Sequence, residues 1–180
     1  PHDQTRRQRQ MCIRDSVAAA AQTSGHAGSA MSQCIFCQIQ AGTLPASVVY
    51  QDERAMVILD LFPIREAHCL VIPREHAPLL EGLDAAVTHH LMDLARRTIV
   101  AQKRAGLAVK AHNVVVNDGR EANQHVPHVH VHVIPRRGGD TLVTALTWAT
   151  RLLNVFGMAK RRKRLDRLAG LLSEHFPDSA

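Results

Sequence analysis

The stretch His128-Val129-His130-Val131-His132-Val133-Ile134 alternates histidine with valine and ends on isoleucine. Successive side chains of a β-strand point to opposite faces, so a strand here would place all three histidines on one face. The β-branched valines would occupy the other face and anchor the strand in an apolar core. A strand held in this way keeps its polar side chains in fixed directions. We therefore predict a strand over His128–Ile134, closed by Pro135, with a functional histidine face.

Three imidazoles on one face indicate a catalytic or metal-binding role. The unperturbed pKa of histidine is about 6.5, so the ring can act as nucleophile, acid or metal ligand. Two other interpretations of the pattern remain: a purely metal-binding strand, and a chance alternation on an exposed strand. The positions between the histidines are all apolar, which disfavours chance because an exposed strand has no need of them.

The rest of the chain contains further patterns of short strands and helices. Apolar runs between turn residues predict strands, and apolar residues three and four apart predict helices. These elements are a short helix or turn at Cys34–Gln40, strands at Val48–Gln51, Ala55–Leu59, His68–Ile72 and Val114–Asn117, and helices at Leu83–Ala105, Leu142–Phe156 and Leu165–His175. Pro73 would close the third strand, and Gly106 would end the long helix. Antiparallel strands with a long helix between them predict an α+β fold.

The chain has 180 residues, of which 46% are apolar and 21% charged, as in ordinary globular proteins. That length allows one domain with tails. We expect a disordered tail or non-native leader over residues 1–30, a domain over residues 31–140 and a helical extension over residues 141–180. No apolar run reaches the ~18–20 residues of a membrane-spanning helix. We therefore expect no membrane contact and a cytoplasmic location.

The formal net charge is +6, and much of the excess lies in one C-terminal segment. The basic residues of this segment are Arg151, Lys160, Arg161, Arg162, Lys163, Arg164 and Arg167. Such a run is most often a solvated helix face, and contact with nucleic acid or a membrane is the alternative. We favour the solvated face and expect no nucleic-acid partner.

Two of the four cysteines, Cys34 and Cys37, form a Cys-x-x-Cys pair, whereas Cys12 and Cys69 have no close partner in the sequence. The sequence shows no secretion signal, so a metal or redox role is favoured over a disulfide framework. The spacing is that of one half of a zinc site. A redox pair and a coincidental pair are the alternatives.

An ordered set of motifs between Cys34 and Arg137 resembles the histidine-triad family, whose signature is His-x-His-x-His followed by apolar residues. The matching motifs are His128-x-His130-x-His132, Ile58-Leu59-Asp60-Leu61-Phe62-Pro63, Ala67-His68-Cys69-Leu70-Val71-Ile72-Pro73-Arg74-Glu75-His76, Val116-Asn117-Asp118-Gly119, Gln124 and Pro135-Arg136. The Cys-x-x-Cys pair is similar to that of a zinc-containing bacterial-type branch. The resemblance implies a HIT-like α+β fold: an antiparallel sheet of about five strands, a long helix and, here, a C-terminal helical extension.

The resemblance also implies roles for the histidines of the catalytic strand, His128, His130 and His132. His130 would attack an α-phosphorus and form a covalent nucleotidyl-histidine that water then hydrolyses. His132 would bond phosphate oxygens and assist the leaving group. Asn117 matches a position that binds phosphate through its amide, which would stabilise developing charge.

The remaining nucleotide-binding positions flank this strand. Asp60 matches a residue that accepts hydrogen bonds from ribose hydroxyls, and His68 matches a histidine close to the triad that supports orientation or shapes the pocket. Gln124 and His125 stand just before the triad. Hydrolase relatives often carry a small hydroxyl residue in place of His125, so this position departs from the pattern.

The third histidine of the signature favours hydrolysis over transfer. The resembling uridylyltransferases of galactose metabolism carry Gln where this chain has His132. The implied activity is hydrolysis of an adenine (purine) nucleotide derivative, either a nucleoside phosphoramidate or a dinucleoside polyphosphate. A nucleotide-binding sensor or scaffold with little turnover, and a metal-binding structural protein, are the other classes.

A structural zinc and a homodimer are implied by the resemblance as well. In family members with this cysteine pair, zinc is completed by two histidines, so the ligands here would be Cys34, Cys37, His76 and His128. Four protein ligands close the coordination shell, which is typical of a structural site. The homodimer would have the helix Leu83–Ala105 and a strand at its interface.

Overall fold

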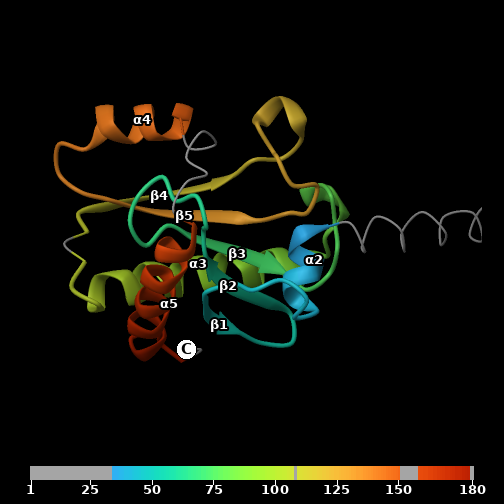
Figure 1. Cartoon of the computed structure of the whole chain (residues 1–180). Helices are drawn as coiled ribbons and strands as arrows, with labels where there is room; N and C mark the ends of the chain where they lie inside the picture. Colours follow the sequence, from blue (N-terminus) through green and yellow to red (C-terminus); the bar gives the residue numbers. More distant parts are fainter. Residues whose placement is uncertain (1–33, 108, 151–157, 179–180) are drawn as a thin grey trace, which may run out of the picture.

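The computed structural model describes residues 34–107, 109–150 and 158–178. Within them, five strands form one sheet in the order β1-β2-β3-β5-β4, and every neighbouring pair is antiparallel (Figure 1). The strands are β1 Val48–Gln51, β2 Ala55–Leu59, β3 Cys69–Pro73, β4 Ala111–Val116 and β5 Val131–Arg136. The tail predicted over residues 1–30 lies outside the described residues.

The helices cover the two faces of this sheet unequally. They are α2 Ile35–Gln40, α3 Ala85–Arg104, α4 Thr141–Thr150 and α5 Met158–Glu174, with single 3-10 turns at Leu80–Gly82 and Arg120–Ala122. One apolar cluster joins the sheet to α3 and α5, and a second cluster joins the sheet to α2. The α+β class and the five-stranded antiparallel sheet are therefore confirmed. None of the helices in the described ranges is long and apolar enough to cross a bilayer.

The alternation in β5 separates the two faces as predicted. Val129, Val131 and Val133 are at most 1% exposed and belong to the cluster that α3 and α5 line. His130 stacks its ring edge against Phe36 of α2, with ring centroids 5.1 Å apart, on the opposite face of the sheet. The valines thus fix the strand from behind while the histidines face α2.

The predicted limits of the last strand, His128–Ile134, were wrong at both ends. The strand begins at Val131, because the amides of His128 and Val129 donate to loop carbonyls, those of Val126 and Ala77, instead of a strand partner. It also continues through Pro135, which pairs with His112 of β4. The pairing of β3 with β5 ends at Val133, so proline interrupts no ladder on that side.

Other predicted boundaries differ by a few residues. β3 starts one residue later than predicted, and β4 starts three residues earlier because Ala111–Asn113 pair with β5. The long helix α3 begins after Asp84, whose carboxylate caps the amide of Ala86 at 2.7 Å, and Gly106 ends it with φ +69°. The predicted helix Leu142–Phe156 is described only over α4, and residues 151–157 lie outside the described residues.

The last helix belongs to the main core. α5 starts seven residues before the predicted Leu165 and buries three of its apolar residues, Leu165, Ala169 and Leu172, in the cluster shared with α3. Its basic run is also less uniform than a solvated face: Lys163, Arg164 and Arg167 are exposed, whereas Arg161 and Arg162 are half-buried. The start of α5 approaches the loop after β2, which makes part of the run structural.

We propose that α5 folds together with the sheet as one cooperative unit. Leu172 is fully buried, so Leu172→Ala should lower the free energy of unfolding by about 2–5 kcal/mol in a single transition. Chemical unfolding followed by circular dichroism measures this. Leu171→Ala, at a half-buried neighbour outside the core cluster, is the control and should cost clearly less. An early, separate transition in Leu172→Ala would contradict a shared core.

Candidate active site and metal centre

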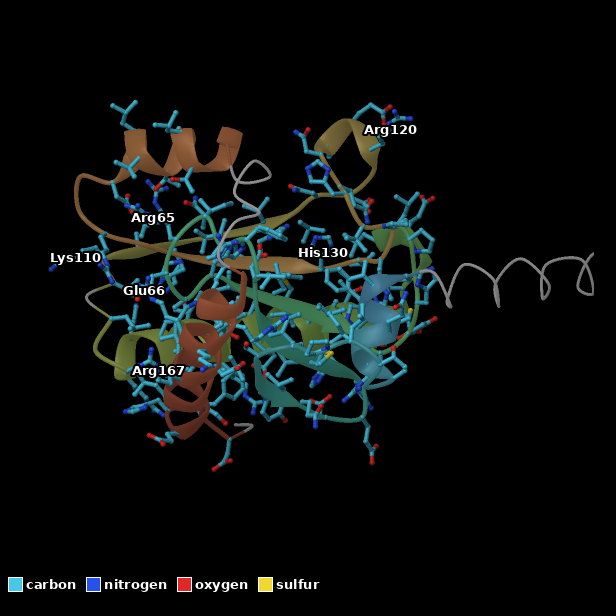
Figure 2. The ribbon with its side chains drawn as sticks, viewed as in Figure 1. Arg65, Glu66, Lys110, Arg120, His130 and Arg167 are labelled. Atoms are coloured by element: carbon cyan, nitrogen blue, oxygen red, sulfur yellow. The ribbon has the colours of Figure 1, made fainter. Side chains whose placement is uncertain are left out.

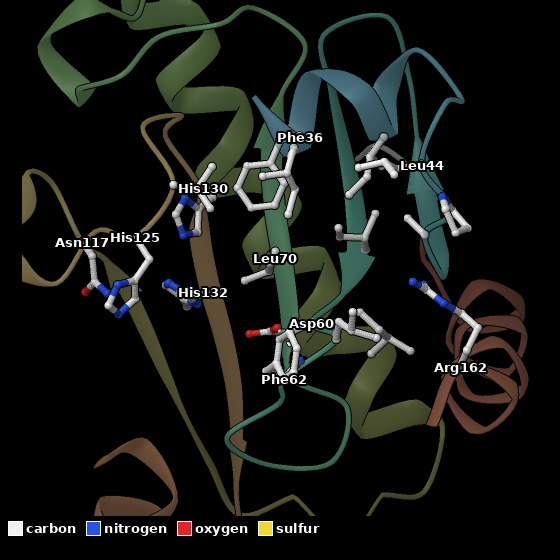
Figure 3. Close-up of a pocket in the computed structure, with 18 of the residues that line it drawn as sticks. Phe36, Leu44, Asp60, Phe62, Leu70, Asn117, His125, His130, His132 and Arg162 are labelled. Carbon is white, nitrogen blue, oxygen red and sulfur yellow. Dashed lines mark hydrogen bonds between the residues drawn. The ribbon is translucent and has the colours of Figure 1, made fainter. Parts of the chain in front are cut away.

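A cavity of about 680 Å³ opens on the face of the sheet that α2 covers (Figure 3). Its size is within the range of small-molecule sites. The apolar wall consists of Ile35, Phe36, Ile39, Leu44, Pro45, Ala46, Ile58, Leu59, Leu61, Phe62, Leu70 and Val126. The polar lining consists of Asp60, Asn117, Asn123, His125, His130, His132 and Arg162. Histidines gather at one side of the cavity and apolar side chains fill most of the rest, which fits a ligand with a flat apolar part and a polar end.

His130 lies directly before β5, in the interior of the molecule (Figure 2), and is 6% exposed. Its Nδ1 lies 2.8 Å from the backbone oxygen of His128. A carbonyl oxygen only accepts, so Nδ1 must carry the proton and donate. The lone pair of the ring is then on Nε2. This bond fixes both the tautomer and the direction of an imidazole that lines the cavity, which is the preparation that a nitrogen nucleophile needs.

His132 is connected to Asp60 through the fully buried His68. Nδ1 of His132 lies 3.0 Å from Nε2 of His68, and Nδ1 of His68 lies 3.3 Å from a carboxylate oxygen of Asp60. The backbone amide of Ile64 donates to the same Nδ1 of His68 at 3.3 Å. One proton lies between Nε2 of His68 and Nδ1 of His132, and the Ile64 amide and the Asp60 carboxylate favour opposite tautomers of His68. His130 and His132 are therefore both oriented through their Nδ1 atoms, the first by a backbone carbonyl and the second by His68.

The structure brings most of the predicted nucleotide-binding residues to this cavity. Asp60, Asn117 and His125 line it, whereas His68 lies behind the wall in contact with His132. Gln124 is not among the lining residues. Its amide instead accepts from the backbone nitrogen of Gly119 and donates to the carbonyl of Pro78, which ties two loops together.

The apolar wall and Arg162 were not predicted from the sequence. Phe36 and Leu44 belong to α2 and the loop after it, and Arg162 comes from α5, more than one hundred residues later. Alternation inside one strand reveals its own face, but nothing local shows which distant side chains complete a cavity. The stretch Ile35-Phe36 beside the cysteine pair was the available signal, since two large apolar residues between metal-ligand candidates need a partner surface.

A second cluster lies beside the cavity and contains Cys34, Cys37, His76 and His128, with one ligand atom of each within 4.8 Å of the others. Sulfur-to-nitrogen distances are 3.4 Å for Cys34–His128, 3.3 Å for Cys37–His76 and 3.6 Å for Cys37–His128. The two Nδ1 atoms lie 3.3 Å apart. A tetrahedral zinc ion has bonds of about 2.3 Å to sulfur and about 2.0–2.1 Å to nitrogen. These bonds require a sulfur-to-nitrogen distance of about 3.5 Å and a nitrogen-to-nitrogen distance of about 3.4 Å. The four residues fit that ion.

Burial keeps His128 neutral, the form that binds a metal, whereas the Cys37 thiol must lose its proton to bind one. Burial raises the pKa of the Cys37 thiol to about 11, and the neighbouring Cys34 adds to the shift. Burial lowers the pKa of His128 to about 4, and the nearby rings of His76 and His130 act in the same direction. Nε2 of His128 donates to the carbonyl of Pro73 at 3.0 Å, so Nδ1 is the nitrogen available to a metal.

Comparison with known proteins identifies the fold and the histidine strand. The family model described as the HIT domain matches residues 41–139, which is more than half of the chain. The chain belongs to the HIT domain family. This HIT domain includes the histidine strand and His76, but it starts after Cys37 and ends before α4, so the cysteine pair and α5 lie outside the matched residues.

Several relatives of this HIT protein are similar over most of their own length. An uncharacterized HIT-like protein of Methanocaldococcus jannaschii is 38% identical over 59% of this chain and 81% of its own. The adenylylsulfatase of Arabidopsis thaliana is 32% identical over 80% of this chain and 70% of its own. The adenosine 5′-monophosphoramidase of Schizosaccharomyces pombe is 34% identical over 57% of this chain and 74% of its own.

Among solved structures, the HIT fold of this chain is similar to a zinc-bound histidine triad family protein of Mycobacterium smegmatis. The two are 33% identical, with a TM-score of 0.60 over 68% of this chain and 96% of that one. The neighbour binds zinc, and the present chain brings two cysteines and two histidines together with zinc-like spacing. The predicted zinc-type branch of the family is thereby confirmed.

Proposed function

We propose that this HIT protein hydrolyses a purine nucleotide derivative at its α-phosphate through a covalent nucleotidyl-histidine on His130. One observation carries the proposal: Nδ1 of His130 donates to the carbonyl of His128 at 2.8 Å, which leaves the nucleophilic lone pair on Nε2 of a ring that lines a ligand-sized cavity. A protein that only binds nucleotides has no need of such an oriented imidazole.

The reaction has two displacements. In the first, Nε2 of His130 bonds to the α-phosphorus while the bond to the leaving group breaks, and a proton passes from His132 to the departing amine or oxygen. In the second, water attacks the phosphorus and gives one proton back to His132, the bond to His130 breaks, and the nucleoside monophosphate leaves. The amide of Asn117, at the same side of the cavity, stabilises charge on the phosphate oxygens.

The rest of the cavity then receives the nucleoside. Asp60 lines its middle, between the histidines and the apolar wall, and its carboxylate suits the two ribose hydroxyls (Figure 3). The apolar wall around Phe36 and Phe62 suits the faces of a purine. The relatives named for adenylyl sulfate and adenosine phosphoramidate support a purine nucleotidyl substrate, and the leaving group is an amine or a second phosphate chain.

His130→Ala should abolish turnover while leaving nucleotide binding in place. We expect kcat to fall more than about 10³-fold, because the variant has no atom to hold the intermediate. The measurement is release of adenosine monophosphate from adenosine phosphoramidate and from diadenosine tetraphosphate. The faster of these substrates in the wild type identifies the leaving group.

His89→Ala is the matched control, since His89 lies exposed on α3, away from the cavity lining. It should retain full activity. Turnover retained by His130→Ala would contradict the covalent route. A folded, metal-loaded wild type that binds nucleotide but hydrolyses neither substrate would instead favour the nucleotide-sensor function.

We further propose that Cys34, Cys37, His76 and His128 hold a structural zinc ion. Four protein donors leave no open position for substrate, so the ion supplies cross-linking instead of Lewis-acid chemistry. Its binding ties α2 to the loop before β5, and His128 is the shared residue, because its backbone oxygen orients His130. Free thiols at this site fit the reducing cytoplasm, where we expect the protein to act.

The purified protein should contain about one zinc ion per chain, and Cys37→Ala should contain almost none. Metal binding displaces the proton of a thiol whose pKa is raised to about 11, so zinc affinity should rise about tenfold or more per pH unit between pH 6 and 8. Elemental analysis and competition with a chromophoric chelator measure both effects. Cys69→Ala, at a buried cysteine outside the cluster, is the control. Full zinc content in Cys37→Ala would refute this ligand set.

We also propose that the protein forms a homodimer. β4 is an edge strand of the sheet, and the side chain of Val114 on it is 38% exposed. An edge of this kind is a template for pairing with a second copy across a two-fold axis.

Val114→Lys should therefore weaken the dimer, because a charged side chain on an edge strand disfavours pairing. Sedimentation equilibrium should give twice the chain mass of 19.9 kDa for the wild type and a shift toward one chain for the variant. Val48→Lys is the control, since Val48 is equally exposed on the opposite edge strand, β1. Equal effects of both substitutions, or a monomeric wild type, would overturn the β4 interface.

A further inference from the structure

Arg162 is the residue of the C-terminal helix that reaches the cavity. It lies in the first turns of α5, is half-buried, and lines the cavity on the side away from His130 (Figure 3). Its near neighbours along the helix have other partners. Arg161 donates to the carbonyl of Leu61 at 3.3 Å, and Arg164 donates to Glu66 at 2.6 Å. Arg162 is thus set apart within the basic run by its place in the cavity wall.

The guanidinium of Arg162 is positioned by a single weak bond. Its Nη1 donates to Oγ of Ser47 at 3.4 Å, and Ser47 in turn donates to Asp166 at 2.6 Å. In the part of the chain that the structure describes, this is the only hydrogen bond that Arg162 makes. An arginine has five N–H donors in a planar fork, so most of them remain for a ligand in the cavity.

The part of the ligand that reaches Arg162 follows from the proposed function, on which this inference rests. With the α-phosphate at His130 and the ribose at Asp60, the base lies along the apolar wall and its distal edge points to the α5 side. Phosphates lie at the opposite side, so Arg162 does not serve them. The edge of a purine farthest from its sugar carries the substituent at C6, with N7 beside it.

We propose that Arg162 contacts this edge and favours a purine with a carbonyl at C6, guanine or hypoxanthine, over adenine. O6 and N7 of guanine are two adjacent acceptors that match the arginine fork, and this pair is the commonest specific arginine contact with a base. Adenine presents an amino group in place of O6, and its hydrogens oppose the guanidinium donors. Arg162 is therefore a specificity-determining residue that the C-terminal helix adds to the site.

The test is equilibrium binding of guanosine, inosine and adenosine 5′-monophosphates, measured by calorimetry on the full-length, metal-loaded protein. Wild type should bind the guanosine and inosine nucleotides about tenfold more tightly than the adenosine nucleotide. In Arg162→Gln this preference should disappear. Arg162→Lys, which keeps the charge but lacks the fork, should also lose most of it. Lys163→Gln, at the exposed neighbouring position, removes the same charge and should keep the full preference.

These outcomes separate the inference from the proposed reaction, because binding of a monophosphate requires no turnover. A preference for O6 purines that vanishes only with Arg162 supports the role of this residue even if hydrolysis fails. Equal affinity of the wild type for all three nucleotides would overturn it, and so would an equal loss for all three in Arg162→Gln. A preference that survives in Arg162→Gln would place the selection elsewhere.

Discussion

The burial of Val129, Val131 and Val133 is the constraint on which the candidate active site depends. Each is at most 1% exposed, in the core that the sheet shares with α3 and α5. Removing a valine side chain from water is worth roughly 1.5–3 kcal/mol, so rotating or sliding this strand would expose a costly apolar face. The same alternation directs His130 and His132 to the other face. The core therefore sets the direction of the imidazoles, and the cavity is built around them.

His128 connects the cluster of two cysteines and two histidines to the candidate active site. Its Nδ1 belongs to the cluster with Cys34, Cys37 and His76, and its backbone oxygen accepts the Nδ1 proton of His130. The backbone here leaves the regular strand, because its amides bond to Val126 and Ala77. A cross-link at the side chain of His128 would limit the movement of this irregular segment. The geometry of the cluster and the orientation of His130 therefore both depend on the same short segment of the chain.

The C-terminal helix has two roles that are separated along its length. Its second half buries Leu165, Ala169 and Leu172 in the common core. Its first half carries the basic run past the loop after β2, where Arg161 bonds to Leu61 and Arg162 lines the cavity. Packing of the second half holds the first half in place. The matched HIT residues end before this helix, so a residue outside the family model contributes to the cavity wall.

The sequence by itself determined the elements whose evidence is local. Alternation predicted the two faces of β5, apolar runs between turn residues predicted β1 and β2 with correct bounds, and Gly106 predicted the end of the long helix. The motif resemblance also grouped the four residues of the metal cluster, which the structure places together. In each case the residues near one another in the chain, or an ordered motif, carried the signal.

Only the tertiary structure decided how distant segments meet. The histidine strand begins only at Val131, because loop carbonyls accept from the preceding amides, and it continues through Pro135, where β3 no longer pairs. The structure also shows that some residues of the basic run are exposed, whereas Arg162 lines the cavity. It also placed Gln124 outside the cavity lining. Charge and polarity along a helix are the same whether a side chain faces water or a cavity, and packing between distant segments is what distinguishes the two.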